Sequence, residues 1–183
     1  FSVLMFVSPS MVTAQVIIPR APDIAANSYV LLDARTGQVL VEENADEPLP
    51  PASLTKIMTA YIAIEEIING TLELTDQVHI SEKAWRMEGS KMFVDVNSQV
   101  SVEDLLRGII IQSGNDASVA ISEHIAGSEE AFADMMNQYS EVLGMKDSFF
   151  MNASGLDTEL YYNTMSARDL SILATATIQR HSQ

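Results

Sequence analysis

The most constraining feature of this sequence is a run of apolar residues at helical spacing that starts near Ser53 and stops at Asn69-Gly70. Its large apolar side chains cover most of the circumference of the predicted helix: Leu54, Ile57, Met58, Tyr61, Ile62 and Ile64. A helix that is apolar nearly all round is buried in the middle of a domain, whereas a surface helix keeps one polar face. Gly after Asn is a common helix end. The rest of the chain must therefore cover this helix.

The segments around this helix carry their own patterns. Residues 28–33 and 39–43 read as two strands of a hairpin, with Gly37 free to take positive φ in the turn. Short strands are possible up to about Asn97, and at 149–151. Further helices are predicted at 101–112, from the break at 113–115 to Ala126, at 128–143, and from 166 onward. Helices mixed with antiparallel strands predict one domain, which suits 183 residues.

Composition excludes several classes of function. Apolar residues make up 47% of the chain and charged residues only 19%, which argues against disorder. Proteins bind nucleic acid largely by neutralising its phosphates with positive charge. The net charge of this chain is −15, so no nucleic-acid partner is expected. The absence of cysteine excludes disulfides and thiolate metal sites.

The first residues resemble the end of a secretory signal peptide. Residues 1–7 are an apolar run, and Val12-Thr-Ala14 before Gln15 offers a cleavage site with small residues. The run is short and interrupted by Pro9, so it does not suit a membrane span. We expect residues 1–27 to be a signal-peptide remnant and linker, in a chain that starts inside a longer precursor. A frayed apolar N-terminus is the alternative.

The motif Ser53-Leu-Thr-Lys56 stands at the start of the central helix. Residues at i and i+3 share a helix face, so the hydroxyl and the amine should meet. Ser53 would gain from the positive end of the helix dipole and from unpaired N–H groups, which favour a developing oxyanion. Burial disfavours the charged form of Lys56, so that its neutral amine can serve as general base. Taken alone, the motif also fits a capping Ser followed by a Lys that reaches solvent.

A second motif, Ser113-Gly-Asn115, lies between two helical segments. Ser113 could relay a proton, and Asn115 could form a hydrogen bond with a substrate amide. Taken alone, this motif also fits a helix break whose ends are capped by polar side chains.

Together the motifs resemble those of serine penicillin-binding enzymes, which combine Ser-x-x-Lys, a Ser-Asp-Asn type motif and Lys-Thr-Gly. Residues 51–60, PASLTKIMTA, are similar to the active-site segment of low-molecular-mass D-alanyl-D-alanine carboxypeptidases. Residues 102–118, VEDLLRGIIIQSGNDAS, are similar to their second segment, and 89–93 to the loop that borders their cleft. Residues 154–157 and 166–169 fit later family segments more loosely. The resemblance runs from about Ser28 to the last residues.

The resemblance implies an α/β (α+β) fold of the serine β-lactamase/D,D-transpeptidase type, a mainly antiparallel sheet flanked by helices, over residues 28–183. It assigns Ser53 as nucleophile and Lys56 as base. Ser113 and Lys56 would shuttle the leaving-group proton, and Asn115 would orient the peptide. Gly114 and Ser90 are expected to contact substrate.

The implied activity is removal of the terminal D-Ala from peptidoglycan stem pentapeptides through an acyl-enzyme. β-Lactams would acylate the same serine. No metal or organic cofactor is implied, and the implied location is the periplasm or cell envelope. A D,D-endopeptidase or a β-lactamase on the same fold is an alternative, as is a non-catalytic peptidoglycan-binding module.

The sequence departs from the family at one motif. No Lys-Thr-Gly occurs in it, although in the family this motif lies on a strand that lines the cleft. We therefore expect a chain that is truncated at its C-terminus and inactive by itself. The family's C-terminal β-rich domain and amphipathic anchor, the one expected membrane contact, would also be missing.

Some residue types are discounted. His79, His124 and His181 stand in no triad or metal spacing, and each is expected at the surface or at a helix cap. Glu159 and Asn163 have the spacing of a catalytic Glu–Asn pair in class A β-lactamases, but a tyrosine-rich loop is the preferred interpretation.

Overall fold

The computed structural model describes residues 22–156 and 162–180, so the predicted signal-peptide segment falls largely outside the described residues. The elements follow one another as β1 (Tyr29–Leu32), β2 (Val39–Glu43), the 3₁₀ turn η1 (Ala52–Leu54), α1 (Thr55–Ile68), β3 (Gln77–His79), α2 (Glu82–Arg86), β4 (Gln99–Ser101), α3 (Val102–Gln112), α4 (Asn115–Ala126), α5 (Glu129–Leu143) and α6 (Ala167–Arg180). Among the described helices, none is both long enough and apolar enough to cross a membrane.

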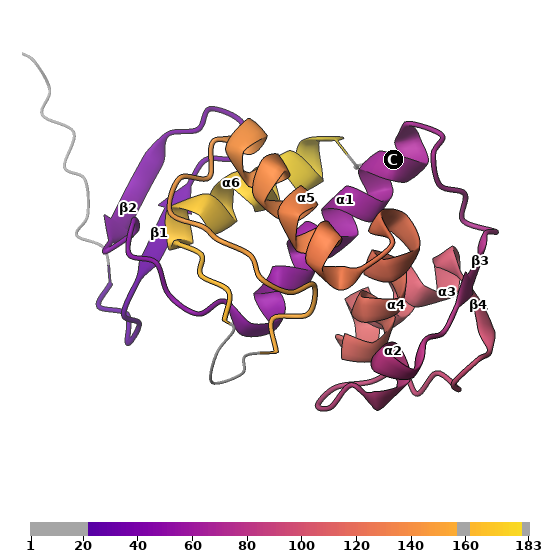
Figure 1. Cartoon of the computed structure of the whole chain (residues 1–183). Helices are drawn as coiled ribbons and strands as arrows, with labels where there is room; N and C mark the ends of the chain where they lie inside the picture. The colour runs from indigo at the N-terminus through magenta and orange to yellow at the C-terminus, as the bar shows by residue number, and fades with distance from the viewer. Residues whose placement is uncertain (1–21, 157–161, 181–183) are drawn as a thin grey trace, which may run out of the picture.

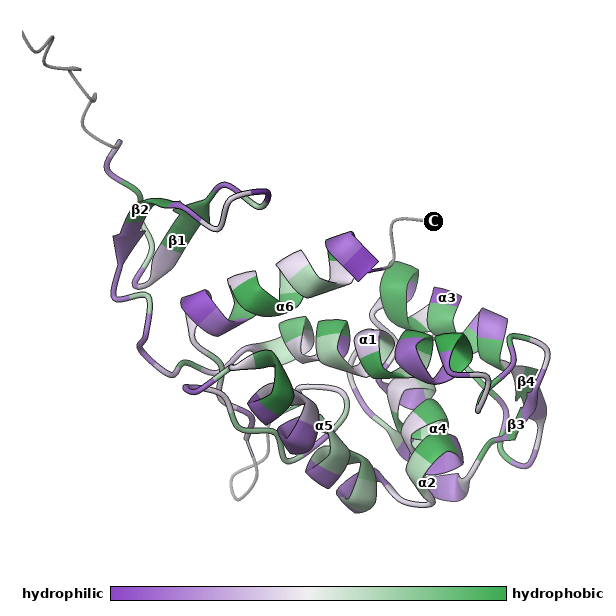
Figure 2. Cartoon of the chain, turned by 90° about the horizontal axis from the view of Figure 1, so that it is seen from above, coloured by the Kyte–Doolittle hydropathy of each residue, from purple (hydrophilic) through white to green (hydrophobic). Residues whose placement is uncertain are grey.

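Helix α1 runs through the middle of the molecule and contacts α3, α4, α5 and α6 (Figure 1). Ala60 and Ala63 face one hydrophobic cluster, which α3, α4 and the β3/β4 region complete. Met58, Tyr61 and Ile62 face a second cluster, formed with α5, α6 and residues 145–153. Figure 2 shows α6 on one side of α1 and α3 and α4 on the other. The helix is apolar nearly all round because it belongs to two cores, as its sequence predicts.

The described strands form two small antiparallel sheets at opposite ends of the molecule (Figure 1). In the first, Tyr29 pairs with Glu43 and Leu32 with Val39, and Gly37 takes a φ of +72° in the turn, as expected. In the second, β3 pairs with β4. Antiparallel strands flanked by helices confirm the predicted fold class.

Polar contacts attach the β1/β2 hairpin to α6. Arg168 donates to Glu42 over 2.8 Å and also bonds Asp46. Near the other end of α6, Gln179 donates to the carbonyl of Ala34 over 2.8 Å. These contacts hold the hairpin against the helix along most of its length.

Two local expectations were incomplete. The stretch between α1 and β4 contains the short helix α2, capped by Ser81, whose hydroxyl accepts from Ala84 N. Its five residues are too few to show a periodic apolar pattern. Residues 149–151 form no strand: Phe149 makes an isolated antiparallel bridge with Thr164.

Candidate active site

Ser53 and Lys56 meet as their spacing predicts. Ser53 lies in η1, two residues before the first residue of α1, and Lys56 Nζ is 3.2 Å from Ser53 Oγ. Ser53 is exposed to solvent, whereas Lys56 is only 4% exposed. The pair therefore joins a reachable hydroxyl to an amine that is withdrawn from solvent.

The environment of Lys56 favours its neutral form. Burial lowers the pKa of its amine to about 8, because the ammonium ion loses hydration inside the protein. Its second contact is a neutral group, the backbone carbonyl of Ser154, which accepts from Nζ over 2.6 Å. An amine of this kind can take a proton from the neighbouring hydroxyl near neutral pH.

The backbone before the nucleophile has an uncommon conformation. Ala52 has a φ of +46°, a left-handed value that side-chain-bearing residues rarely adopt. The backbone of Gly155 lies against it, so closely that a Cβ on Gly155 would stand 1.8 Å from the Ala52 carbonyl oxygen. Only glycine fits there, and its close approach holds the turn that presents Ser53.

Residues 151–155 form a loop fixed by polar side chains. Asn152 Oδ1 accepts from the N–H groups of Ser154 and Gly155, over 3.1 and 2.6 Å. Asn163, which is fully buried, accepts from Met151 N and donates to Thr55 Oγ1 over 3.0 Å. The sequence interpretation of Asn163 as part of a tyrosine-rich loop missed this role, because burial of an isolated Asn leaves no pattern. Glu159, its suggested partner, lies outside the described residues.

The second motif forms the corner between α3 and α4. Ser113 is the C-cap of α3; it is half-buried and has a left-handed φ of +54°. Asn115 is the first residue of α4. The N–H of the buried Gly114 donates to the Gly108 carbonyl over 3.0 Å. Asn115 is buried, and its Nδ2 donates to the Glu88 carbonyl over 2.7 Å. The helix break predicted from the sequence is thus a tightly bonded corner.

The corner holds the loop that contains Ser90. Asn115 N donates to the Ser90 carbonyl over 2.8 Å, while the rest of Ser90 is exposed. The buried carboxylate of Asp116 accepts from the N–H groups of Met92 and Phe93 over 3.0 and 2.9 Å. Sequence reasoning did not single out Asp116, although a carboxylate directly after the motif, at the positive end of a helix, is a readable signal.

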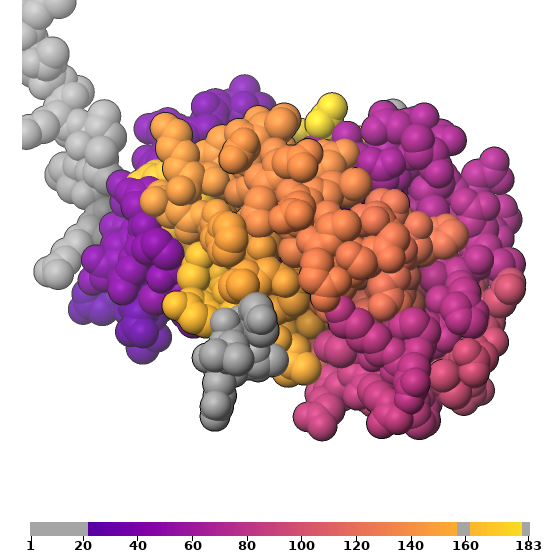
Figure 3. Space-filling model, in the orientation of Figure 1, coloured from indigo at the N-terminus to yellow at the C-terminus, as the bar shows by residue number. Residues whose placement is uncertain are grey.

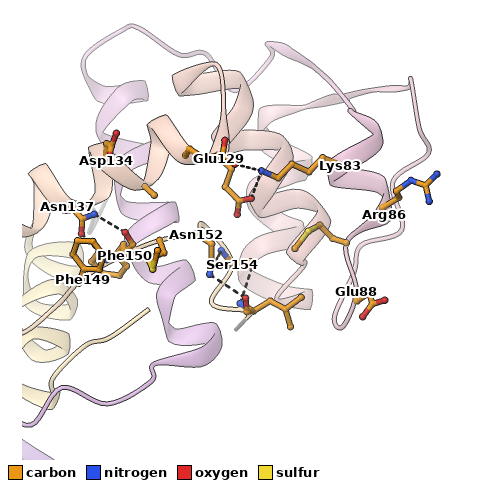
Figure 4. A pocket seen from close by; sticks show the side chains of 15 residues that line it. Lys83, Arg86, Glu88, Glu129, Asp134, Asn137, Phe149, Phe150, Asn152 and Ser154 are labelled. Carbon is orange, nitrogen blue, oxygen red and sulfur yellow. Dashed lines mark hydrogen bonds and ion pairs between the residues drawn. The ribbon is translucent and has the colours of Figure 1, made fainter. Parts of the chain in front are cut away.

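A cavity of about 900 Å³ is lined by residues that bond the two motifs, although no residue of either motif is among its lining residues. Ser154, whose carbonyl holds Lys56, and Glu88, whose carbonyl holds Asn115, both line it. Its apolar lining includes Phe149, Phe150 and Met151. Figure 3 shows the face on which it opens, and Figure 4 shows its lining from α2, α5 and the 149–156 segment.

The 151–156 segment links the two motifs. Its Ser154 carbonyl binds Lys56, and a Cβ added to Gly89 would lie 2.9 Å from Asn115 Nδ2 and 4.0 Å from Leu156 Cδ1. Lys56 and the loop bonded to Asn115 therefore both approach this segment. His79 and His124 are exposed and belong to no part of it, and His181 lies outside the described residues.

Comparison with solved structures identifies the fold. The solved structure of penicillin binding protein 5 from Haemophilus influenzae superposes with a TM-score of 0.84 at 42% identity, covering 90% of this chain and 48% of that one. The D-alanyl-D-alanine carboxypeptidase DacD from Francisella tularensis gives 0.87 at 39% identity, covering 94% of this chain and 41% of that one. The fold is therefore that of the penicillin-binding proteins.

Sequence comparison gives the family. A family model described as D-alanyl-D-alanine carboxypeptidase, peptidase family S11, matches residues 15–183. The carboxypeptidase DacC of Escherichia coli K12 is 43% identical over 164 residues. The chain belongs to the D-alanyl-D-alanine carboxypeptidase family. The match covers 86% of this chain and 40% of the length of DacC.

Proposed function

We propose that this protein is a serine D-alanyl-D-alanine carboxypeptidase that removes the terminal D-Ala from peptidoglycan stem pentapeptides. One observation carries the proposal: the exposed hydroxyl of Ser53 lies 3.2 Å from the amine of a buried lysine. Burial sets the pKa of Lys56 to about 8, so a usable fraction of the amine is neutral at physiological pH. Membership of the carboxypeptidase family supports the same conclusion.

In the acylation step, neutral Lys56 takes the hydroxyl proton while Ser53 Oγ bonds to the carbonyl carbon of the penultimate D-Ala. Negative charge then develops on the former carbonyl oxygen. The N–H of Ser53, at the positive end of α1, donates to this oxygen and stabilises its charge.

To complete acylation, the proton held by Lys56 passes through the Ser113 hydroxyl to the nitrogen of the terminal D-Ala. The C–N bond to that residue breaks, free D-Ala leaves, and the peptide stays on Ser53 as an ester. Water then hydrolyses the ester and frees Ser53. Asn115 orients the peptide through its amide oxygen, since its Nδ2 is already bonded to Glu88. Gly114 and Ser90 border the peptide from the α3/α4 corner and its neighbouring loop.

The substrate and its mimics follow from this chemistry. The stem peptide beyond the two D-Ala residues can lie in the 900 Å³ cavity, over Phe149 and Met151. β-Lactams, which mimic D-Ala-D-Ala, acylate Ser53 in its place. The protein works in the bacterial periplasm, and residues 1–14 are the end of the signal peptide that exports it.

Product analysis tests the reaction against its alternatives. The purified full-length protein, extended through the expected Lys-Thr-Gly motif, is given a stem pentapeptide, a cross-linked dimer or a β-lactam, and the products are separated by chromatography. A carboxypeptidase releases free D-Ala from the pentapeptide. Cleavage of the cross-link alone would indicate an endopeptidase, fast β-lactam turnover a β-lactamase, and no turnover with retained peptide binding a non-catalytic module.

A further inference from the structure

Glu129 is a buried carboxylate in the first turn of α5, at the edge of the cavity (Figure 4). Its Oε1 accepts from Ala153 N over 3.0 Å, and its Oε2 lies 3.0 Å from Lys83 Nζ. Lys83 also bonds Glu130, over 2.9 Å. The nearby ammonium compensates the buried negative charge, which would otherwise be costly.

Both backbone polar groups of Ala153 form hydrogen bonds with side chains. Glu129 accepts its N–H, and the hydroxyl of Thr59, on α1, donates to its carbonyl over 2.7 Å. The next carbonyl along the chain, that of Ser154, accepts from Lys56 Nζ over 2.6 Å. A path of hydrogen bonds and the backbone of two residues, Ala153 and Ser154, thus runs from Glu129 to the amine beside Ser53.

We propose that Glu129 is a positioning residue for the general base, acting through Ala153 and the carbonyl of Ser154. This inference rests on the proposed function of Lys56. A neutral amine has one lone pair, and it must face the hydroxyl hydrogen of Ser53. One N–H anchored on the Ser154 carbonyl fixes that orientation, provided that the carbonyl itself cannot move.

The chain offers a conservative variant and a matched control. Glu129→Ala removes the acceptor for Ala153, and Glu129→Gln keeps an oxygen that can accept the same N–H. Glu130→Ala removes a neighbouring carboxylate that also bonds Lys83. The Glu130 side chain is 76% exposed and, among the described residues, it forms no hydrogen bond or ion pair with the 151–155 loop. For each purified variant, the rate constant of acylation by a fluorescent penicillin is measured from about pH 6 to about pH 10, together with the melting temperature.

Misplacing a catalytic group lowers the rate at every pH, so we expect Glu129→Ala to acylate roughly tenfold to a hundredfold more slowly, including on the plateau above the pKa of Lys56. Glu129→Gln should retain most of the rate, and Glu130→Ala all of it.

Two results would overturn the inference. A lowered melting temperature with an unchanged rate would make Glu129 a structural residue only. A loss that disappears at high pH would mean that Glu129 acts on the charge of Lys56 and not on its position. If the wild-type protein itself is not acylated on Ser53, the proposed function fails first.

Discussion

At the scale of single residues, the chemistry depends on where Lys56 is placed. The ammonium form loses hydration at this position, and its partners are a hydroxyl and a carbonyl, neither of which is an anion. A lysine paired with a carboxylate would stay charged and could not accept a proton. The carbonyl of Ser154 therefore orients the amine without fixing its charge.

The pH dependence of acylation follows from this environment. The neutral amine is the active form, so the rate constant for acylation by penicillin should rise with pH and level off above about pH 8, the pKa of Lys56. Lys56→Arg should fail nearly as badly as Lys56→Ala, since guanidinium stays protonated at any accessible pH. Stopped-flow measurement of the three proteins checks this. An arginine variant that acylates at the wild-type rate would show that position 56 supplies only a charge.

At the scale of elements, the sequence predicted the longer pieces well. The apolar positions of α1, the serine caps of α3 and α5 and the turn at Gly37 each carry a local signal. Helix α2 and the fixing of the 151–155 loop could not be predicted in this way. Helix α2 is too short to show a periodic apolar pattern. The fixing of the 151–155 loop depends on contacts between residues far apart in the chain, such as Asn163 with Thr55. The motifs located the candidate site, but the partner of Lys56, a backbone carbonyl, has no sequence signature.

The close approach of Gly155 to Ala52 gives a stability prediction with a matched control. Gly155 and Gly70 both have a φ of +75°, but nothing lies within 4 Å of a Cβ added to Gly70. Gly70→Ala should lower the free energy of unfolding by about 1 to 2 kcal/mol through backbone strain alone. Gly155→Ala adds a steric overlap with the Ala52 carbonyl, which should lower the free energy of unfolding by roughly 1 to 3 kcal/mol more.

Urea unfolding of the two alanine variants measures the difference. The Gly155 variant should also acylate more slowly per folded molecule, because the turn that presents Ser53 is displaced. Equal losses of stability in the two variants would mean that the loop can move away from η1 without difficulty.

At the scale of the whole molecule, two cores share one helix. Met58, Tyr61 and Ile62 pack on one side of α1, and Ala60 and Ala63 pack on the other. Lys56 lies in the first turn of α1, and Ser53 lies in the 3₁₀ turn η1 that leads into it. The reaction centre is thereby tied to the packing of the entire domain. Burying a lysine in such a centre lowers stability at neutral pH, since the unfolded chain keeps its ammonium hydrated.

This link predicts how stability varies with pH. The pKa of Lys56 is about 8 in the folded protein and about 10.4 in an unfolded chain. Between these values the unfolded state binds more protons, so the contribution of Lys56 to the free energy of unfolding rises with pH, and below about pH 8 its penalty is complete. When urea unfolding is measured at several pH values across this window, the free energy of unfolding of wild type should rise with pH relative to that of Lys56→Met. A difference that stays constant would place the amine in a hydrated environment.

The most direct test of the account is the site of acylation. The full-length protein is used, because residues 1–183 lack the Lys-Thr-Gly motif and are expected to be inactive by themselves. It is treated with penicillin and digested, and the peptides are analysed by mass spectrometry. The account predicts one adduct, on the peptide that contains Ser53, and loss of labelling in Ser53→Ala while the variant melts at a similar temperature. An adduct on another residue, or undiminished labelling of Ser53→Ala, would contradict it.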